Sequence, residues 1–219
     1  MKRYAVTLTG ETPLLMHQDN LPWAEAMNKW RLDPANKKIS VPGDDRTPPF
    51  RWIGCLYIEG GRVVMPADNL MTVLREGGKK VSTGKGQETF GRYTQSGMIV
   101  DQSAWPVLIG GKEIPYAPIK ALIDEPDFSK HLSAIGAMGF ELFVKRAKIG
   151  AAKHVRVRPR FDSWVLQGTI TVLLDNISTD ILESILQVGG VYCGLGDWRP
   201  SSPKAAGSFG KFSAKVEEL

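Results

Sequence analysis

Three arginines at alternate positions have the spacing that would suit a chain of phosphates. They are Arg156, Arg158 and Arg160, in the sequence Arg-Val-Arg-Pro-Arg. In an extended strand, alternate side chains share one face, so we expect a row of arginines with Val155 and Val157 facing inward. A guanidinium donates two parallel hydrogen bonds to phosphate, and such contacts hold a nucleic-acid backbone. The alternative is an edge strand whose charges prevent aggregation.

The arginine row belongs to a longer stretch without acidic residues. Between Leu142 and Phe161 the chain has seven basic residues and no Asp or Glu. This concentration of positive charge favours binding of a polyanion over a plain solvated strand. The seven residues are Lys145, Arg146, Lys148, Lys153, Arg156, Arg158 and Arg160.

A glycine-rich segment near the C-terminus is a second candidate for binding. Glycines allow positive φ angles and close approach of the backbone to a ligand, and exposed amides beside basic side chains can hold phosphates. A tryptophan there could stack on a base. The alternative is a structural turn with a packed tryptophan. The residues concerned are Gly194, Gly196, Gly207 and Gly210, with Trp198, Arg199 and Lys204.

The glycine-lysine segment 77–97 is the third candidate. Phe90 and Tyr93 interleave with its charges, a pattern typical of surfaces that hold a single strand by charge and stacking. A plain flexible loop is the alternative. Its basic residues are Lys79, Lys80, Lys85 and Arg92.

A catalytic or metal site has little support in the sequence. His17, His131 and His154 share no metal-ligand spacing, and Cys55 and Cys193 form no CxxC pair. Phosphate-loop, nucleophile-elbow and HExxH motifs are absent. We therefore expect no metal and no cofactor. His17 follows the first expected strand and would be the acid-base residue if the protein cut its ligand.

Composition restricts the class of protein further. The 219 residues are 42% hydrophobic and 23% charged, with a net charge of +5, which are globular values that exclude wholesale disorder. The mild basic excess permits a polyanionic partner without requiring one. The apolar run at the N-terminus is too short for a signal peptide, and no apolar run is long enough to span a membrane. Two free thiols fit a reducing compartment, so we expect a cytoplasmic protein without a membrane partner.

The expected elements place these segments in an α+β fold. Stripped of insertions, their order reads β-α-β-β-α-β, with helices on one face of a sheet. We expect a single domain over 1–219, with flexible inserted segments near 31–50 and 77–97 and a middle insertion near 98–150. The main expected elements are a strand over Tyr4–Thr9, a helix over Trp23–Trp30, a helix over Pro66–Arg75 ended by Gly77-Gly78, a strand over Trp164–Leu174, a helix from Ser178 ended by Gly189-Gly190, and a strand over Phe209–Val216.

Three motifs in this order resemble the RAMP superfamily, the Cas5, Cas6 and Cas7 proteins of CRISPR systems. Gly194-Leu-Gly196 followed by Gly207-Ser-Phe-Gly-Lys-Phe212 resembles the family's glycine-rich loop. Thr7 to Leu14 resembles its first strand and Thr-Pro-Leu turn. Val64 to Arg75 resembles the start of the first helix in the Cas7 branch, although Ala67-Asp68 stands where that branch has Gly-Ser.

The resemblance implies a ferredoxin-like, RRM-related core with inserted loop and β-hairpin lobes that grip RNA. Cas7-type members assemble along a guide RNA and mostly hold it without cutting. A divergent relative encoded by a phage or mobile element, or a single-stranded DNA protein on the same fold, fits the departures from the family pattern.

Three functions therefore stay open. The first is a non-catalytic binder of single-stranded nucleic acid, RNA or DNA, that forms a homo-oligomer or joins a nucleoprotein complex. The second is a metal-independent, Cas6-like RNA endonuclease that uses His17. The third is an assembly or inhibitory subunit that binds a protein partner through the same surface.

Overall fold

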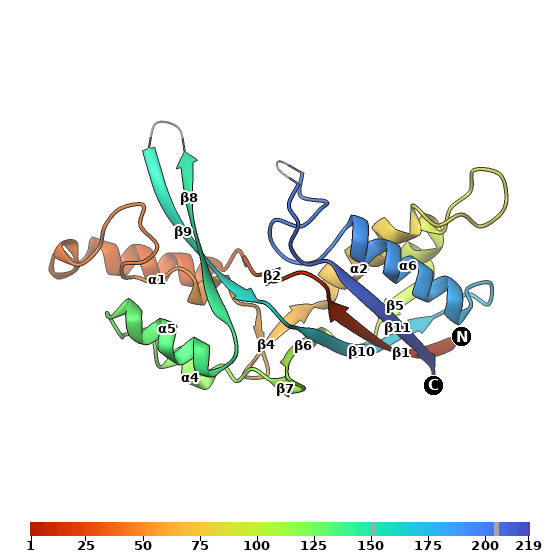
Figure 1. The fold of residues 1–219 in the computed structure, drawn as a ribbon, viewed down its shortest axis with the longest axis horizontal. Coiled ribbons are helices and arrows are strands. Elements are labelled where there is room, and N and C mark those ends of the chain that lie inside the picture. The colour runs from red at the N-terminus through yellow and green to blue at the C-terminus, as the bar shows by residue number, and fades with distance from the viewer. Residues whose placement is uncertain (150–151, 204–205) are drawn as a thin grey trace. The chain divides into compact units, whose positions relative to one another are not determined.

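The chain forms two compact units in the computed structural model, which describes residues 1–149, 152–203 and 206–219 (Figure 1). Unit 1 comprises Met1–Leu14, Val64–Glu113 and Asp162–Leu219, and unit 2 comprises Leu15–Val63 and Ile114–Phe161. Both segments of unit 2 are thus insertions in the chain of unit 1. Of the expected insertions, 31–50 belongs to unit 2, 77–97 belongs to unit 1, and 98–150 divides between them.

Unit 1 is an antiparallel sheet with helices. Its strands run in the order β11-β1-β10-β6-β4, while β5 also pairs with β10 and β7 with β6. The mixed α+β class expected from the sequence is confirmed. The strands are β1 (Lys2–Gly10), β4 (Arg62–Pro66), β5 (Met98–Val100), β6 (Ala104–Ile109), β7 (Lys112–Glu113), β10 (Val165–Val172) and β11 (Phe212–Glu218), and the helices are α2 (Ala67–Gly78), α3 (Gly91–Gly97) and α6 (Thr179–Tyr192).

Alternation of side chains along β1 divides the sheet into a buried and an exposed face. Tyr4, Val6 and Leu8 are buried, whereas Arg3 and Thr9 are exposed. This period of two places one face against the core. The other face of β1, β10 and β11 carries small and charged residues and no aromatic side chain along these three strands, so it offers a base no ring to stack on.

Two glycines allow α2 and α6 to pack closely side by side (Figure 1). A Cβ atom on Gly77 of α2 would collide with the carbonyl oxygen of Ile185, and one on Gly189 of α6 would lie 2.9 Å from the carbonyl oxygen of Val73. The expectation that Gly189-Gly190 ends the second helix is wrong, because α6 continues to Tyr192. These glycines serve helix packing, whereas Gly77-Gly78 does end α2 as expected.

Unit 2 is built around a long hairpin and several short helices. Strands β8 (Glu141–Ile149) and β9 (Ala152–Phe161) pair along their whole length, and β2 (Leu14–Leu15) joins the other edge of β9. The expected helix over Trp23–Trp30 is confirmed as part of α1. The remaining elements are α1 (Leu21–Leu32), the 3₁₀ helices η1 (Pro34–Lys38) and η2 (Ile53–Cys55), β3 (Ile58–Glu59), α4 (Ala117–Lys120) and α5 (Phe128–Ala137).

The segment expected to be a flexible insertion near 31–50 is docked onto β9. The Val155 amide donates to the Gly43 carbonyl at 2.8 Å, and the Asp45 amide donates back to the Val155 carbonyl at 3.0 Å. Two backbone hydrogen bonds of this kind hold the segment as a short extra strand would. The sequence hides this because proline and glycine there indicate only a loop.

An aromatic cluster around His131 forms the core of unit 2. His131 is fully buried, its Nδ1 accepts from Trp52 Nε1 at 3.2 Å, and its Nε2 lies 2.8 Å from the Glu125 carbonyl. These partners require a neutral ring with its proton on Nε2. Burial lowers the pKa of His131, since desolvation disfavours the charged ring. His131 is therefore a core residue, and it binds no ligand in this arrangement.

No helix within the described ranges is both long and apolar enough to cross a membrane.

The glycine contact between α2 and α6 generates a prediction of stability. Gly189→Ala should lower the free energy of unfolding by about 1–3 kcal/mol, because the new methyl group meets backbone that cannot move aside. Gly136→Ala in α5 is the matched control, since a Cβ there meets nothing within 4 Å, and it should stabilise by up to about 1 kcal/mol. Urea unfolding followed by circular dichroism measures both. Equal effects of the two changes would contradict the packing argument.

Candidate nucleic-acid interface

The hairpin β8–β9 divides the seven basic residues between two faces. Partners directly opposite in an antiparallel pair point to the same side. Arg156 pairs with Lys145 and Arg158 with Phe143, so one face holds Lys145 and the three arginines, while the partner of Arg146 is Val155, on the other face. Val157 is fully buried between the arginines. The expected alternation is confirmed. The basic stretch, however, is not one continuous surface, and of Lys148 the structure describes only the backbone.

The arginine row has acidic partners that the sequence pattern did not reveal. The Asp45 carboxylate, 3% exposed, lies 3.4 Å from Arg156 Nη1 and 4.0 Å from Arg51 Nη1. The same carboxylate accepts from the Val157 amide at 3.4 Å. Arg160 lies 3.7 Å from Glu141, its cross-strand partner. Two arginines thus converge on one buried carboxylate, so positive charge exceeds negative charge at this point.

His17 and Arg158 lie together at the rim of a cavity of about 210 Å³ in unit 2. Arg158 Nη2 is 3.3 Å from Nε2 and 3.4 Å from Nδ1 of the His17 ring. Arg51 and Arg156 line the same cavity. The cavity therefore presents three guanidinium groups and one imidazole to a ligand, together with the exposed carboxylate of Asp19. This is the strongest cluster of anion-binding groups that we find among the described residues.

A second cavity, of about 400 Å³, lies next to the first and shares Arg51 and Arg156 with it. It adds Arg31 and Lys37, which come from the end of α1 and from η1. Asp44 also lines it, but forms an ion pair at 2.7 Å with Arg46. The Arg46 guanidinium lowers the pKa of Asp44, so that this carboxylate stays charged and paired. Four cationic side chains then face two carboxylates across this cavity.

The glycine-rich loop of unit 1 uses its own amides internally. The amides of Gly194, Gly207 and Gly210 donate to the carbonyls of Gly189, Arg199 and Pro13. Arg199 donates to the Gly196 carbonyl at 2.9 Å and to Ser201 Oγ at 3.0 Å. These bonds fit a structural turn better than a phosphate cradle. Trp198 is half-buried with a φ of +48°. Lys204 lies outside the described residues.

The glycine-lysine segment of unit 1 is only partly an exposed lobe. Phe90 is 5% exposed, so the expectation that it stacks on a strand is wrong: its ring packs against Tyr93. Lys79 pairs with Glu76 at 2.8 Å, and Lys80 lies 4.9 Å from the centre of the Tyr192 ring. Lys85 and Arg92 are exposed.

Several residues of the interface escaped the sequence analysis. Asp45, Arg51, Arg31 and Lys37 lie in or beside the segment predicted to be a flexible insertion, about 100 residues before the hairpin in the sequence. Only docking of that segment onto β9 brings them together. The feature of the sequence that could have indicated them is the series of charged residues within 31–51, which is interrupted by prolines. Among the described residues there is no cluster of His, Cys, Asp and Glu that could hold a metal ion.

Comparison of the chain with models of known protein families, and with curated proteins, gives no match.

The buried carboxylate generates a prediction for the interface. Asp45→Ala should lower the free energy of unfolding by about 3 kcal/mol, because it leaves two arginines and the Val157 amide without their acceptor. Asp44→Ala, which removes only the ion pair with half-exposed Arg46, should cost less than about 1 kcal/mol. Chemical unfolding monitored by tryptophan fluorescence separates the two. If the neighbouring aspartates behave alike, Asp45 has no special structural role.

Proposed function

We propose that this chain binds single-stranded nucleic acid, RNA foremost, and holds it without cutting. The observation that carries the proposal is the convergence of Arg51, Arg156 and Arg158 on two adjoining cavities of unit 2. Guanidinium groups bind phosphate with paired hydrogen bonds. Their positions on one hairpin face and one docked loop give a strand a path that phosphates can follow. The third function left open by the sequence, binding of an acidic protein partner, has no separate observation in its favour.

We further propose a ferredoxin-like core of the RAMP type for unit 1. Its elements occur along the chain in the order β1-α2-β5-β10-α6-β11. In the sheet, the strands lie in the order β11-β1-β10-β5 and each neighbouring pair is antiparallel. Helix α2 lies in the connection from β1 to β5, and α6 lies in the connection from β10 to β11. This order supports the β-α-β-β-α-β pattern expected from the sequence. From the resemblance to Cas7 proteins we also propose that several copies assemble along one strand. The mass of the protein in solution, measured with and without RNA, tests that assembly.

Binding should depend steeply on salt. A labelled 20-nucleotide RNA and the matching DNA, titrated by fluorescence anisotropy between 50 and 300 mM salt, should show a falling log K with log salt. Arg158→Ala should weaken binding several-fold and reduce the slope by about 0.7, the value for one phosphate contact on a single strand. Lys120→Ala, an exposed lysine of α4, is the control and should change neither. A flat salt plot for the wild type would contradict the proposal.

The contact between His17 and Arg158 supports a second candidate, metal-independent cleavage of RNA. The imidazole would move a proton while the guanidinium stabilises charge on the phosphate in the transition state. Incubation with structured RNA in EDTA tests this. On our first proposal the RNA stays intact. Specific cleavage that disappears in His17→Ala, and persists in Lys120→Ala, would establish a nuclease and replace the proposal of a non-catalytic binder.

A further inference from the structure

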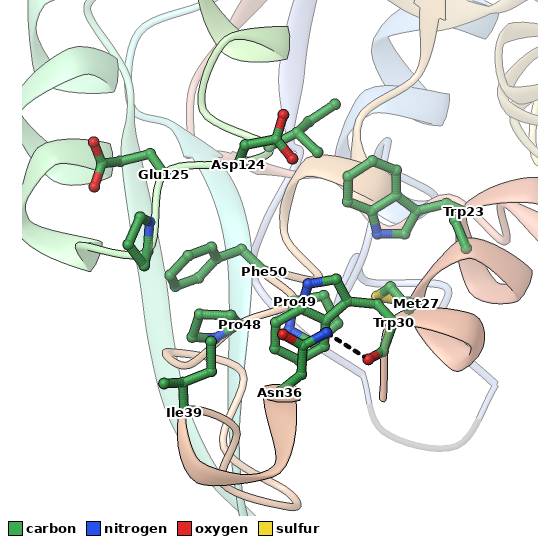
Figure 2. Close-up of a pocket in the computed structure, with 13 residues that line it drawn as sticks. Trp23, Met27, Trp30, Asn36, Ile39, Pro48, Pro49, Phe50, Asp124 and Glu125 are labelled. Carbon is green, nitrogen blue, oxygen red and sulfur yellow. Dashed lines mark hydrogen bonds between the residues drawn. The ribbon is translucent and has the colours of Figure 1, made fainter. Parts of the chain in front are cut away.

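An aromatic pocket of about 340 Å³ lies in unit 2, formed by α1, η1, the segment Pro48–Phe50 and the residues 123–126 (Figure 2). Its volume is within the range of small-molecule sites. Trp23, Trp30 and Phe50 line it on different sides, together with the apolar side chains of Met27 and Ile39. None of these residues belongs to the motifs that the sequence analysis selected. Such flat rings around one hollow suit a planar, aromatic ligand.

The polar groups of the pocket can read the edge of such a ligand. Trp23 Nε1 is a buried donor without a hydrogen-bond partner among the described residues. A buried donor left unpaired costs about 1–3 kcal/mol, and this one lies against Gly54, where an added Cβ would meet it at 2.6 Å. The Asp124 carboxylate stands at the rim, exposed to solvent (Figure 2). Glu125 points away from the hollow in Figure 2 and is held by Lys130 at 2.8 Å.

The cationic cavity described above adjoins this pocket. The two share Asn36, Pro48 and Pro49 as lining residues. Asn36 is fixed between them, because its Nδ2 donates to the Trp30 carbonyl at 2.8 Å. On the cationic side, His154 Nδ1 is a second buried polar atom without a partner among the described residues. An aromatic pocket thus continues into a cavity that prefers anions.

We propose that the aromatic pocket takes one unstacked base of the bound strand, with the phosphate attached to that nucleotide in the cationic cavity. This inference rests on the proposed function and adds a subsite to it. Base stacking on the half-buried Trp30 supplies affinity that does not depend on sequence. Asp124 accepts a hydrogen bond from an exocyclic amino group, as acidic side chains do from cytosine N4. The pocket therefore prefers cytosine to uracil.

A quaternary ammonium ligand is the chemical alternative, since aromatic rings with a carboxylate also bind such cations. The adjoining Arg31, Lys37, Arg51 and Arg156 oppose it, because they repel a cation and attract a phosphate. The pocket is also larger than a single trimethylammonium group requires. The positive charge next to the pocket therefore favours a nucleotide over a quaternary ammonium ion.

Two variants test the subsite through binding of labelled oligocytidine and oligouridine. Trp30→Ala should weaken binding of both by about tenfold, the loss of one stacked base. Asp124→Asn should reduce or reverse the preference for oligocytidine, because an amide can donate to uracil O4 whereas a carboxylate cannot. Glu25→Gln, at an exposed position of α1, is the control and should leave both affinities unchanged. Circular dichroism confirms that each variant is folded.

Photo-crosslinking locates the base directly. An oligonucleotide with one 5-iodocytosine, irradiated on the wild-type protein and digested, should give an adduct on Trp23 or Trp30. If wild-type protein binds the strand but Trp30→Ala and Asp124→Asn change neither affinity nor preference, the subsite is refuted while strand binding stands. If the wild type binds no strand, the proposed function fails and the subsite with it. Competition by tetramethylammonium, with none by cytidine monophosphate, would assign the pocket to a cation.

Discussion

The buried carboxylate of Asp45 joins parts of unit 2 that are far apart in the sequence. It contacts Arg51 beside the docked segment, and Arg156 and the Val157 amide on β9. A buried charge needs partners of this kind, because desolvation would otherwise make it unstable. Both cavities with cationic linings have Arg51 and Arg156 in their walls. The position of the candidate interface therefore depends on this one acid and the arginines that surround it.

Partial neutralisation of the arginines has a physical advantage for a site of this type. Guanidinium groups without any counter-charge would repel one another across a narrow cavity. A shared carboxylate holds them in place and leaves a positive excess toward solvent. In the proposed function, the phosphate groups of the bound strand supply the remaining negative charge. The same arrangement keeps Arg156 pre-oriented, so that less side-chain entropy is lost on binding.

Glycines and aromatic residues have different roles in the two units. In unit 1 the glycines serve packing and turns: Gly77 and Gly189 allow α2 and α6 to approach, and the loop amides around Gly207 and Gly210 are satisfied within the chain. In unit 2 the partly exposed Trp23 and Trp30 line a pocket. The glycine-rich motifs, which resembled ligand-binding segments in the sequence, thus have structural roles. The cavities lined by cationic and aromatic side chains lie in unit 2.

The sequence alone determined the α+β class, the alternation of Arg156, Arg158 and Arg160 about buried Val157, and the helices over α1, α2 and the first part of α6. Each follows from a local period of two or 3.6 residues. Tertiary structure alone decided which cations meet at the candidate interface. Asp45 and Arg51 join β9 because backbone hydrogen bonds dock their segment there. Gly189 lies inside α6 and does not end it, and the absence of a side chain there lets α2 pack against α6. Such contacts depend on distant residues, which no local pattern records.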